Sequence, residues 1–271
     1  MACAKYCRFR FYGNLNDFFS FAQRGRWIDF AIDGTVAVKN PIESLGVPHP
    51  EVESILVNGV SVGFEHHLAH GEHIRVLPLV HALPIPETVP LRPPLRRPPR
   101  FVVDTHLGRL AAYLRMLGFD TIYRNDFDDP DLARIAQDED RVLLTRDRGL
   151  LKRKNVTYGF CVRQAIPRAQ LVDAVRRFRL ELDAQPWRRC VHCNGLLLPV
   201  AKEDILDDLE PKTKLYYHKF ERCESCGQIY WKGSHHERMH AFLDEVLAEA
   251  RIPEPLPPYA GPDTSDRESE P

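Results

Sequence analysis

The sequence of 271 residues lacks long apolar runs and lacks an excess of charge of either sign. No stretch approaches the roughly 18 to 20 apolar residues of a membrane-spanning helix, and the first residues have no apolar core followed by a small-residue cleavage site. We therefore expect no membrane contact and a cytoplasmic location. In that reducing compartment, the paired cysteines among the seven are expected to bind metal rather than form disulfides.

The small net charge conceals segments of opposite charge. The formal net charge is −1, from 37 basic and 38 acidic residues. By itself this value argues against a nucleic-acid partner, because binding to phosphates requires clustered Lys and Arg. However, residues 101–140 contain nine acidic and four basic residues, whereas residues 141–179 contain two acidic and eleven basic residues. Residues 241–271 contain eight acidic and two basic residues. The charges cancel between segments, so a nucleic-acid partner is compatible with this composition.

The first 80 residues alternate short apolar runs with turn residues, which predicts a compact α+β domain with a mixed sheet. Asn58-Gly59 lies between two apolar runs and predicts a type I′ hairpin turn. Strands are expected at 7–11, 27–30, 54–57 and 74–77, with a helix around 15–22.

Two segments have no apolar periodicity. Residues 81–100 are rich in proline and contain four arginines, which is typical of an extended linker. This linker is either a plain spacer or a basic arm that contacts RNA. The acidic tail at 251–271 is expected to be disordered.

Residues 101–183 alternate strand and helix patterns, which predicts an α/β domain with a parallel sheet. Asp104 and Asp147 each follow an apolar strand of this domain, and ligands of open parallel sheets lie beyond the carboxyl ends of the strands. A lone aspartate there is also a common turn residue. Convergent carboxylates, however, favour a hard cation such as Mg²⁺ and metal-assisted hydrolysis of a phosphodiester.

Asp129 fits two roles that do not exclude each other. It precedes Pro130 at the predicted start of a helix, where it can cap the helix or provide a third carboxylate. The neighbouring acids that are alternatives for the third carboxylate are Asp126, Asp128 and Asp131.

A basic segment surrounds Asp147. Because carboxylates alone repel RNA, a cationic surface must provide the attraction to phosphate. The candidate RNA-binding residues of this domain are Arg109, Arg146, Arg148, Lys152 and Arg153, with Lys154, Arg163 and Arg168 in the same stretch. Tyr158 either packs in the core or stacks on a base.

Residues 186–240 contain two Cys-x-x-Cys pairs, Cys190 with Cys193 and Cys223 with Cys226. Four thiolates form a closed tetrahedral site, which predicts a structural Zn²⁺ in a small zinc ribbon. Strands are expected at 216–222 and 228–231. Lys232 and His235, with His236 and Arg238, form either an RNA-binding cluster or the start of a helix capped by Ser234.

Three motifs within 101–180 carry a resemblance to a known family. FVVDTHLGRLAAYLRMLGFD, DDPDLARIA and RVLLTRDRGLL resemble the PIN-like ribonuclease domain of the mut-seven C-terminal family. The resemblance implies a PIN-like α/β fold with an Mg²⁺ or Mn²⁺ site at Asp104, Asp129 and Asp147 that cuts RNA. PIN nucleases often have a fourth acid near the end of this core, and residues 155–164 contain none.

Residues 1–80 resemble the ubiquitin-like β-grasp domain that precedes this nuclease in the family. The resemblance rests on Ile-Leu-Val-Asn-Gly and on the closing Gly-Glu-His-Ile-Arg-Val-Leu-Pro, and it allows two roles, docking to a protein partner or presenting RNA. Sulfur carriers of this fold need a free Gly-Gly end, whereas Leu77-Pro78 continues into the linker. We therefore expect no sulfur transfer.

These observations favour a metal-dependent ribonuclease with RNA as its substrate. The alternative is a non-catalytic RNA-binding or adaptor protein that retains the PIN-like core and the ribbon. The missing fourth acid favours this alternative, and the three acids at strand and helix ends oppose it.

Overall fold

The computed structural model of the chain describes residues 5–78 and 88–251 and contains two compact units, divided between Pro94 and Leu95. Residues 81–87 of the predicted linker, and all of the predicted tail after Arg251, lie outside the described residues.

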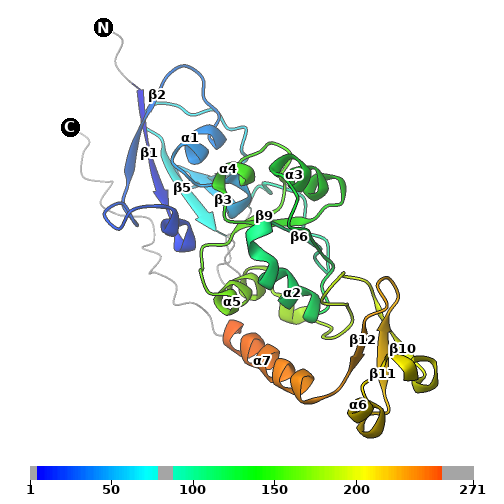
Figure 1. Cartoon of the computed structure of the whole chain (residues 1–271). Helices are drawn as coiled ribbons and strands as arrows, with labels where there is room; N and C mark the ends of the chain where they lie inside the picture. The colour runs from blue at the N-terminus through cyan, green and yellow to red at the C-terminus, as the bar shows by residue number, and fades with distance from the viewer. Residues whose placement is uncertain (1–4, 79–87, 252–271) are drawn as a thin grey trace. The chain divides into compact units, whose positions relative to one another are not determined.

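The N-terminal unit contains a five-stranded mixed sheet (Figure 1). The strand order is β2-β1-β5-β3-β4, in which β1 and β5 are parallel and the other neighbours are antiparallel. Its elements are β1 Lys5–Phe11, β2 Ile28–Ile32, α1 Lys39–Ser44, β3 Val52–Val57, β4 Val60–Val62 and β5 His73–Pro78. Asn58 and Gly59 have φ angles of 48° and 89°, which confirms the type I′ turn between β3 and β4.

The helix predicted around residues 15–22 is wrong in type and extent. A short 3₁₀ helix occupies Gly13–Phe18, and the chain is extended at Phe19. Leu15 and Phe18 are the buried residues of this segment, and their spacing of three places them on one side of a 3₁₀ helix. A second 3₁₀ turn lies at His49–Glu51.

The second unit is built on a four-stranded parallel sheet in the order β7-β6-β8-β9. Its elements are β6 Phe101–Val103, α2 Gly108–Met116, β7 Thr121–Tyr123, α3 Asp129–Asp138, β8 Val142–Thr145, α4 Arg148–Leu151, β9 Gly159–Cys161 and α5 Pro167–Phe178, with 3₁₀ turns at Thr105–Leu107 and Leu180–Leu182. The sequence continues from β6 to β7 on one side and returns to β8 on the other, so the strand order reverses next to β6. Such a reversal opens a crevice at the carboxyl ends of the strands.

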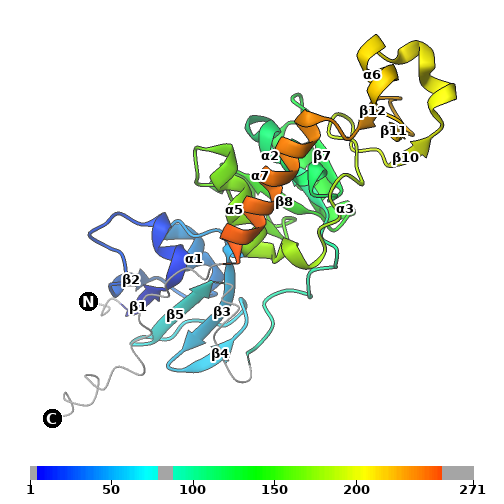
Figure 2. The same cartoon turned by 90° about the horizontal axis from the view of Figure 1, so that it is seen from below.

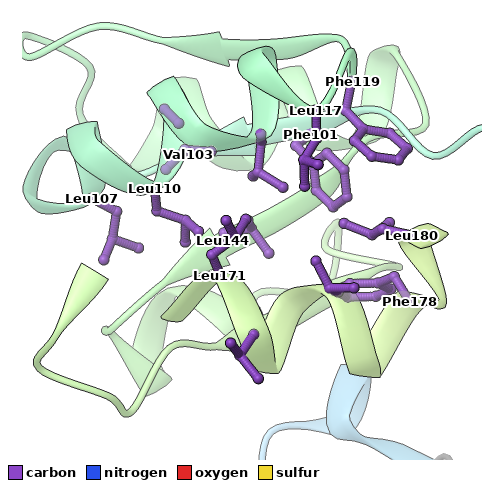
Figure 3. Close-up of a cluster of buried hydrophobic side chains, with 14 of the residues drawn as sticks. Phe101, Val103, Leu107, Leu110, Leu117, Phe119, Leu144, Leu171, Phe178 and Leu180 are labelled. Carbon is purple, nitrogen blue, oxygen red and sulfur yellow. The ribbon is translucent and has the colours of Figure 1, made fainter. Parts of the chain in front are cut away.

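Helices cover both faces of this sheet. Alternate strand residues, among them Phe101 and Leu144, belong to a core that also includes Leu110 and Leu171 from the helices α2 and α5 (Figure 3). On the other face α3 contacts β6 and β8, whose remaining positions such as Val102 are also fully buried. Burial on both faces explains why the strands are continuous apolar runs in the sequence.

The cysteine-containing region is an insertion between two helices of this core. After α5 the chain forms β10 Leu197–Val200, a 3₁₀ helix Lys202–Asp208, α6 Pro211–Tyr216, β11 Phe220–Cys223 and β12 Ile229–Trp231, with an antiparallel sheet in the order β10-β11-β12. It then returns as α7 Ser234–Ala250, which packs along α5 (Figure 2). Leu243, Val246 and Ala250 of α7 belong to the core of the parallel-sheet domain, so the predicted boundary at residue 240 falls inside a helix.

Two local predictions for the inserted region are corrected. The strand predicted from residue 216 begins only at Phe220, because Pro211 starts a helix that extends to Tyr216. Gly233 is the N-cap of α7, and Ser234 is its first helical residue and does not cap it.

Three arginines of the predicted linker bind the protein itself. Arg92 donates to the carbonyl of Val52, Arg97 donates to the carbonyl of Phe178, and Arg100 donates to the carbonyl of Glu139. These contacts favour a structural role for the arginines over an RNA-gripping arm.

We expect Leu243→Ala to lower the free energy of unfolding by ~2–5 kcal/mol, because it leaves a cavity where α7 meets the core. Urea unfolding followed by circular dichroism measures this change. The matched control is Glu237→Ala, an exposed position of the same helix, for which we expect less than ~0.5 kcal/mol. Equal effects of the two substitutions would show that α7 is not part of the core.

Candidate active site and metal centre

Asp104 and Asp147 are connected through Thr145 at the edge where the strand order reverses. Asp104 follows β6, and Thr145 is the last residue of β8. The Thr145 hydroxyl donates to Asp104 Oδ2 at 2.5 Å, and its oxygen accepts the backbone N–H of Asp147 at 2.9 Å. Thr145 is fully buried. This threonine fixes the positions of both acids, and it was not among the predicted site residues.

Both acids also cap the helical turns that follow them. Asp104 Oδ1 accepts the N–H of Thr105 at 2.5 Å, and Asp147 Oδ1 accepts the N–H of Gly149 at 2.6 Å. Asp104 is partly buried, whereas Asp147 is exposed. These backbone bonds restrict the carboxylate orientations, while the exposure of Asp147 leaves the edge accessible to a ligand.

Asp129 is not the helix cap. Asp128 is the N-cap of α3 and accepts the N–H of Asp131, and Asp129 is the first helical residue. Asp129 Oδ2 lies 3.9 Å from an Nη of Arg153, which follows α4. The capping alternative for Asp129 is therefore wrong, and its carboxylate faces a residue of the segment that begins at Asp147.

The acids that were alternatives to Asp129 as the third carboxylate have other partners. Asp126 binds Arg124 through both oxygens at 2.9 and 2.6 Å, and this hydrogen bonding lowers the pKa of Asp126. Asp131 lies 3.3 Å from Arg134. Because these acids already pair with arginines, Asp129 is favoured as the third acid.

The three acids do not form a closed ligand cage. In the described parts of the chain, the four cysteines are the one group of three or more His, Cys, Asp or Glu whose ligand atoms all lie within 4.8 Å of one another. The acids offer only oxygen ligands, and Asp147 is open to solvent. This donor set suits Mg²⁺ or Mn²⁺, which retains several waters and is bound by few carboxylates.

The basic candidates differ in their exposure. Arg109, Arg146, Arg148 and Arg153 are exposed, and Lys152 is partly buried. Two further members of the basic stretch serve the fold instead: Arg168 binds Glu249 of α7 at 2.5 Å, and Arg163 lies over the ring of Phe160.

The segment that follows β9, the strand beside β8, has no acid. Strand β9 pairs with β8 and is followed by Val162, Arg163 and Gln164. Tyr158, just before β9, packs against the hydrophobic core, which favours its structural interpretation over base stacking. The predicted absence of a fourth acid from residues 155–164 therefore leaves a basic and an amide side chain at the end of β9.

The four cysteines form a complete site for a tetrahedral metal. The Sγ atoms of Cys190 and Cys226 are 3.6 Å apart, and those of Cys193 and Cys223 are 3.3 Å apart. Ligands at the usual Zn–S distance of about 2.3 Å lie about 3.8 Å apart in a tetrahedron. The donor set and the spacing therefore fit Zn²⁺, and four protein ligands leave no open position.

Tyr230 of β12 contacts the cysteine site and lowers the pKa of one of its thiols. Its hydroxyl oxygen accepts the N–H of Val191 at 3.2 Å and lies 3.1 Å from Cys190 Sγ. Burial raises the pKa of the Cys190 thiol, but the hydrogen bonds from Tyr230 and from the backbone outweigh burial and lower this pKa to about 7. Burial raises the pKa of Cys193 to about 12. Of these two thiols, Cys190 therefore more readily provides a thiolate.

The first cysteine pair is attached directly to the parallel-sheet domain. Buried Arg115 of α2 donates to the carbonyls of Val191 and His192. Asn194 accepts the N–H of Thr121 and donates to Asp120 at 2.8 Å. These hydrogen bonds fix the metal site to the connection between α2 and β7, and no sequence motif indicated them.

A cavity of about 640 Å³ lies in the inserted region and is lined in part by Tyr230, which also contacts Cys190. Its lining includes Trp187, Trp231, Lys219, Lys232 and His236. The His236 ring lies against Trp187 with centroids 4.2 Å apart. Burial, together with the nearby His240 and Lys232, lowers the pKa of His236. Of the two predicted RNA contacts here, Lys232 lines the cavity, and His235 is exposed on the first turn of α7.

Comparisons with known proteins match both units. A family model described as Mut7-C RNAse domain matches residues 99–243, and one described as Mut7-C ubiquitin matches residues 4–84. No curated protein matches the chain. Among the described residues, no helix combines the length and the apolar character that crossing a bilayer requires.

We expect Tyr230→Phe to weaken zinc binding by about tenfold, because it removes a hydrogen bond that lowers the pKa of Cys190. As the pKa of Cys190 rises, protons compete at higher pH, so the midpoint of acid-induced zinc release moves to higher pH. A chromogenic chelator measures this midpoint. Tyr216→Phe, at an exposed tyrosine of α6, is the matched control. Coinciding release curves for the two variants would contradict the role of Tyr230.

Proposed function

Because the Mut7-C RNAse domain model covers more than half of the chain, the chain belongs to this family, and we propose that it is a metal-dependent ribonuclease. The observation that carries the proposal is the linkage of Asp104 and Asp147 through Thr145 where the strand order reverses. Two acids held in this way at the strand ends, where open parallel sheets bind their ligands, fit cation-assisted cleavage of a phosphodiester.

The strand orders and the family matches support a fold for each part of the chain. The strand order β7-β6-β8-β9 with helices on both faces supports a PIN-like domain. The order β2-β1-β5-β3-β4 and the match to a ubiquitin model support a β-grasp domain. The cysteines, which lie before β10 and around the turn between β11 and β12 of an antiparallel three-stranded sheet, support a structural zinc ribbon.

In the proposed mechanism, Asp104, Asp129 and Asp147 would hold Mg²⁺ or Mn²⁺. When bound, the cation polarises the phosphate and lowers the pKa of an attacking water. Thr145 keeps one oxygen of Asp104 hydrogen-bonded and so sets the direction of the other. Exposed Arg146 and Arg148 on either side of Asp147 attract the RNA backbone, which the carboxylates alone would repel.

The ribbon provides a second proposed contact with RNA. Lys232 and Lys219 line a cavity that also contains Trp187 and Trp231. Ammonium groups bind phosphate and aromatic rings stack on bases, so such a lining suits a single-stranded segment. His235, exposed on the first turn of α7 and next in sequence to the lining residue His236, would add a hydrogen-bonding group.

The second candidate function is RNA binding without cleavage. It is favoured by the absence of an acid after β9, where Arg163 and Gln164 lie. It is opposed by the arrangement around Thr145, which binding alone does not require.

We expect Asp104→Asn and Asp147→Asn each to reduce RNA cleavage by at least about 100-fold. The amide oxygen can still accept the capping hydrogen bonds, so the substitutions remove charge and preserve the fold. Single-turnover cleavage of labelled single-stranded RNA, with Mn²⁺ added or omitted, measures the effect. Omitting Mn²⁺ avoids a chelator that would also remove zinc.

Asp126→Asn is the matched control, because Asp126 is a nearby exposed acid that is already paired with Arg124. We expect its cleavage rate to stay within about twofold of that of the unmodified protein. RNA binding without any Mn²⁺-dependent product would select the non-catalytic alternative, and undiminished cleavage by the double variant of Asp104 and Asp147 would refute the site.

We expect Thr145→Val to lower kcat about 10- to 100-fold with a smaller change in KM, because Thr145 positions Asp104 without contacting RNA. The Mn²⁺ concentration for half-maximal activity should rise in parallel. Thr145→Ser keeps the hydroxyl and should restore both values. A Thr145→Ser variant as impaired as Thr145→Val would indicate that packing, and not the hydrogen bond, is what matters.

A further inference from the structure

The strand β1 separates apolar and cationic residues onto its two faces. Cys7, Phe9 and Phe11 are at most 2% exposed and belong to the core of the N-terminal unit. Arg8 and Arg10 occupy the intervening positions on the other face, about 7 Å apart, between Tyr6 and Tyr12. This face of the strand is therefore a row of two guanidinium groups flanked by two aromatic rings.

The neighbouring strands extend this row. In the parallel pairing of β1 with β5, Arg8 lies opposite His73 and Arg10 lies opposite Arg75. Paired residues point to the same face of a sheet, so these four side chains share one surface. The antiparallel pairing with β2 adds Asp29, which lies opposite Arg8.

Trp27, just before β2, organises the arginines. The guanidinium carbons of Arg8 and Arg10 lie 5.9 and 6.0 Å from its ring centroid, and the His73 ring lies 5.1 Å from it. Arg10 also lies 5.4 Å from the ring of Tyr12. Its Nε is buried and has no hydrogen-bond partner among the described residues. Cation–π contacts therefore hold the guanidinium of Arg10 in place of a hydrogen bond from Nε.

We propose that this surface, the arginine–aromatic face (Tyr6, Arg8, Arg10, Tyr12, Trp27, His73 and Arg75), binds single-stranded RNA. The arginines provide donors for phosphates, and the rings provide platforms for bases, which is the combination by which sheets bind single-stranded RNA. The inference rests on the proposed function in one respect, because it takes RNA as the ligand of the chain. It adds a binding site that lies outside the nuclease unit.

Charge decides between RNA and a protein partner for this face. Aromatic and arginine side chains also occur in protein interfaces. Among the described residues that the pairings of β1 with β2 and β5 place on this face, however, Asp29 is the one acid beside three arginines, and it already pairs with Arg8 at 3.1 Å. Glu72, which precedes β5, directs its carboxylate to His66 and to the N–H of Ala69. The excess of positive charge favours a polyanion.

The test measures RNA binding by the full chain carrying Arg10→Gln and Arg75→Gln. Asp147→Asn is included in every protein so that RNA is not cut. The control carries Arg24→Gln and Arg26→Gln, which removes two charges from the loop before β2 of the same unit. The probe is a labelled single strand of about 30 nucleotides, long enough to contact more than one surface.

We expect the face variant to bind about tenfold more weakly at low salt. The slope of log K against log salt should decrease by about 1.4, because each of the two arginines that no longer neutralises a phosphate removes about 0.7 from it. The control should stay within about twofold of the parent protein. Thermal unfolding of both variants, matched to the parent, excludes loss of structure as the cause.

Photo-crosslinking of the same RNA to the parent protein provides an independent readout, with labelled peptides expected at Tyr6 or Trp27. The inference is overturned if the face variant binds like the control, or if no crosslink maps to residues 5–30; a protein-docking face would give that outcome. If the parent protein binds no RNA at all, the ribonuclease proposal fails as well. If the protein with Asp147 intact cleaves RNA and the face variant still binds like the control, the inference alone fails.

Discussion

The parallel pairing of β6 with β8 brings the carboxyl ends of two strands together, and the chemistry of the second unit depends on this pairing. It places Thr145 within hydrogen-bond distance of Asp104, although the two residues are far apart in sequence. Strand β7 lies on the opposite side of β6 from β8, so the connections that follow β6 and β8 run to opposite sides of the sheet. The carboxyl ends of β6 and β8 therefore stay uncovered by these connections. One hydroxyl buried at this point then sets the positions of both neighbouring acids.

The sequence predicted the sheet and the positions of its acids, because β6 and β8 are apolar on both faces and polar residues follow them. It did not predict Thr145, because a threonine that ends a strand acquires a partner only through the register of another strand. It also could not distinguish Asp128 from Asp129 as the cap of α3, since both acids fit and the choice depends on backbone angles. Tyr230 and Arg115 act on the cysteine site through contacts that no local pattern records.

The number of basic residues in the sequence overstates the number of cationic side chains that are available to bind RNA. Within the basic stretch, Arg141 pairs with Asp120 and Glu139, and Arg168 pairs with Glu249 of α7. These arginines stabilise the fold, as those of the linker do. Exposed cations remain around Asp147, and on the sheet of the N-terminal unit Arg8 is exposed while Arg10 and Arg75 are partly buried. A count of charges in the sequence therefore locates cationic segments but does not separate structural arginines from those that face solvent.

The insertion of the cysteine region between α5 and α7 determines the order in which the second unit is completed. Leu243 and Val246 fill the core from a helix that follows both cysteine pairs in the sequence. A ribosome therefore releases all four cysteines before it releases the helix that closes the apolar surface beside α5. Contacts between distant segments form slowly, and exposed apolar surface promotes aggregation while they form. All four cysteines have thus left the ribosome while the apolar surface beside α5 is still uncovered, so the cysteine site can form before the core of the second unit closes.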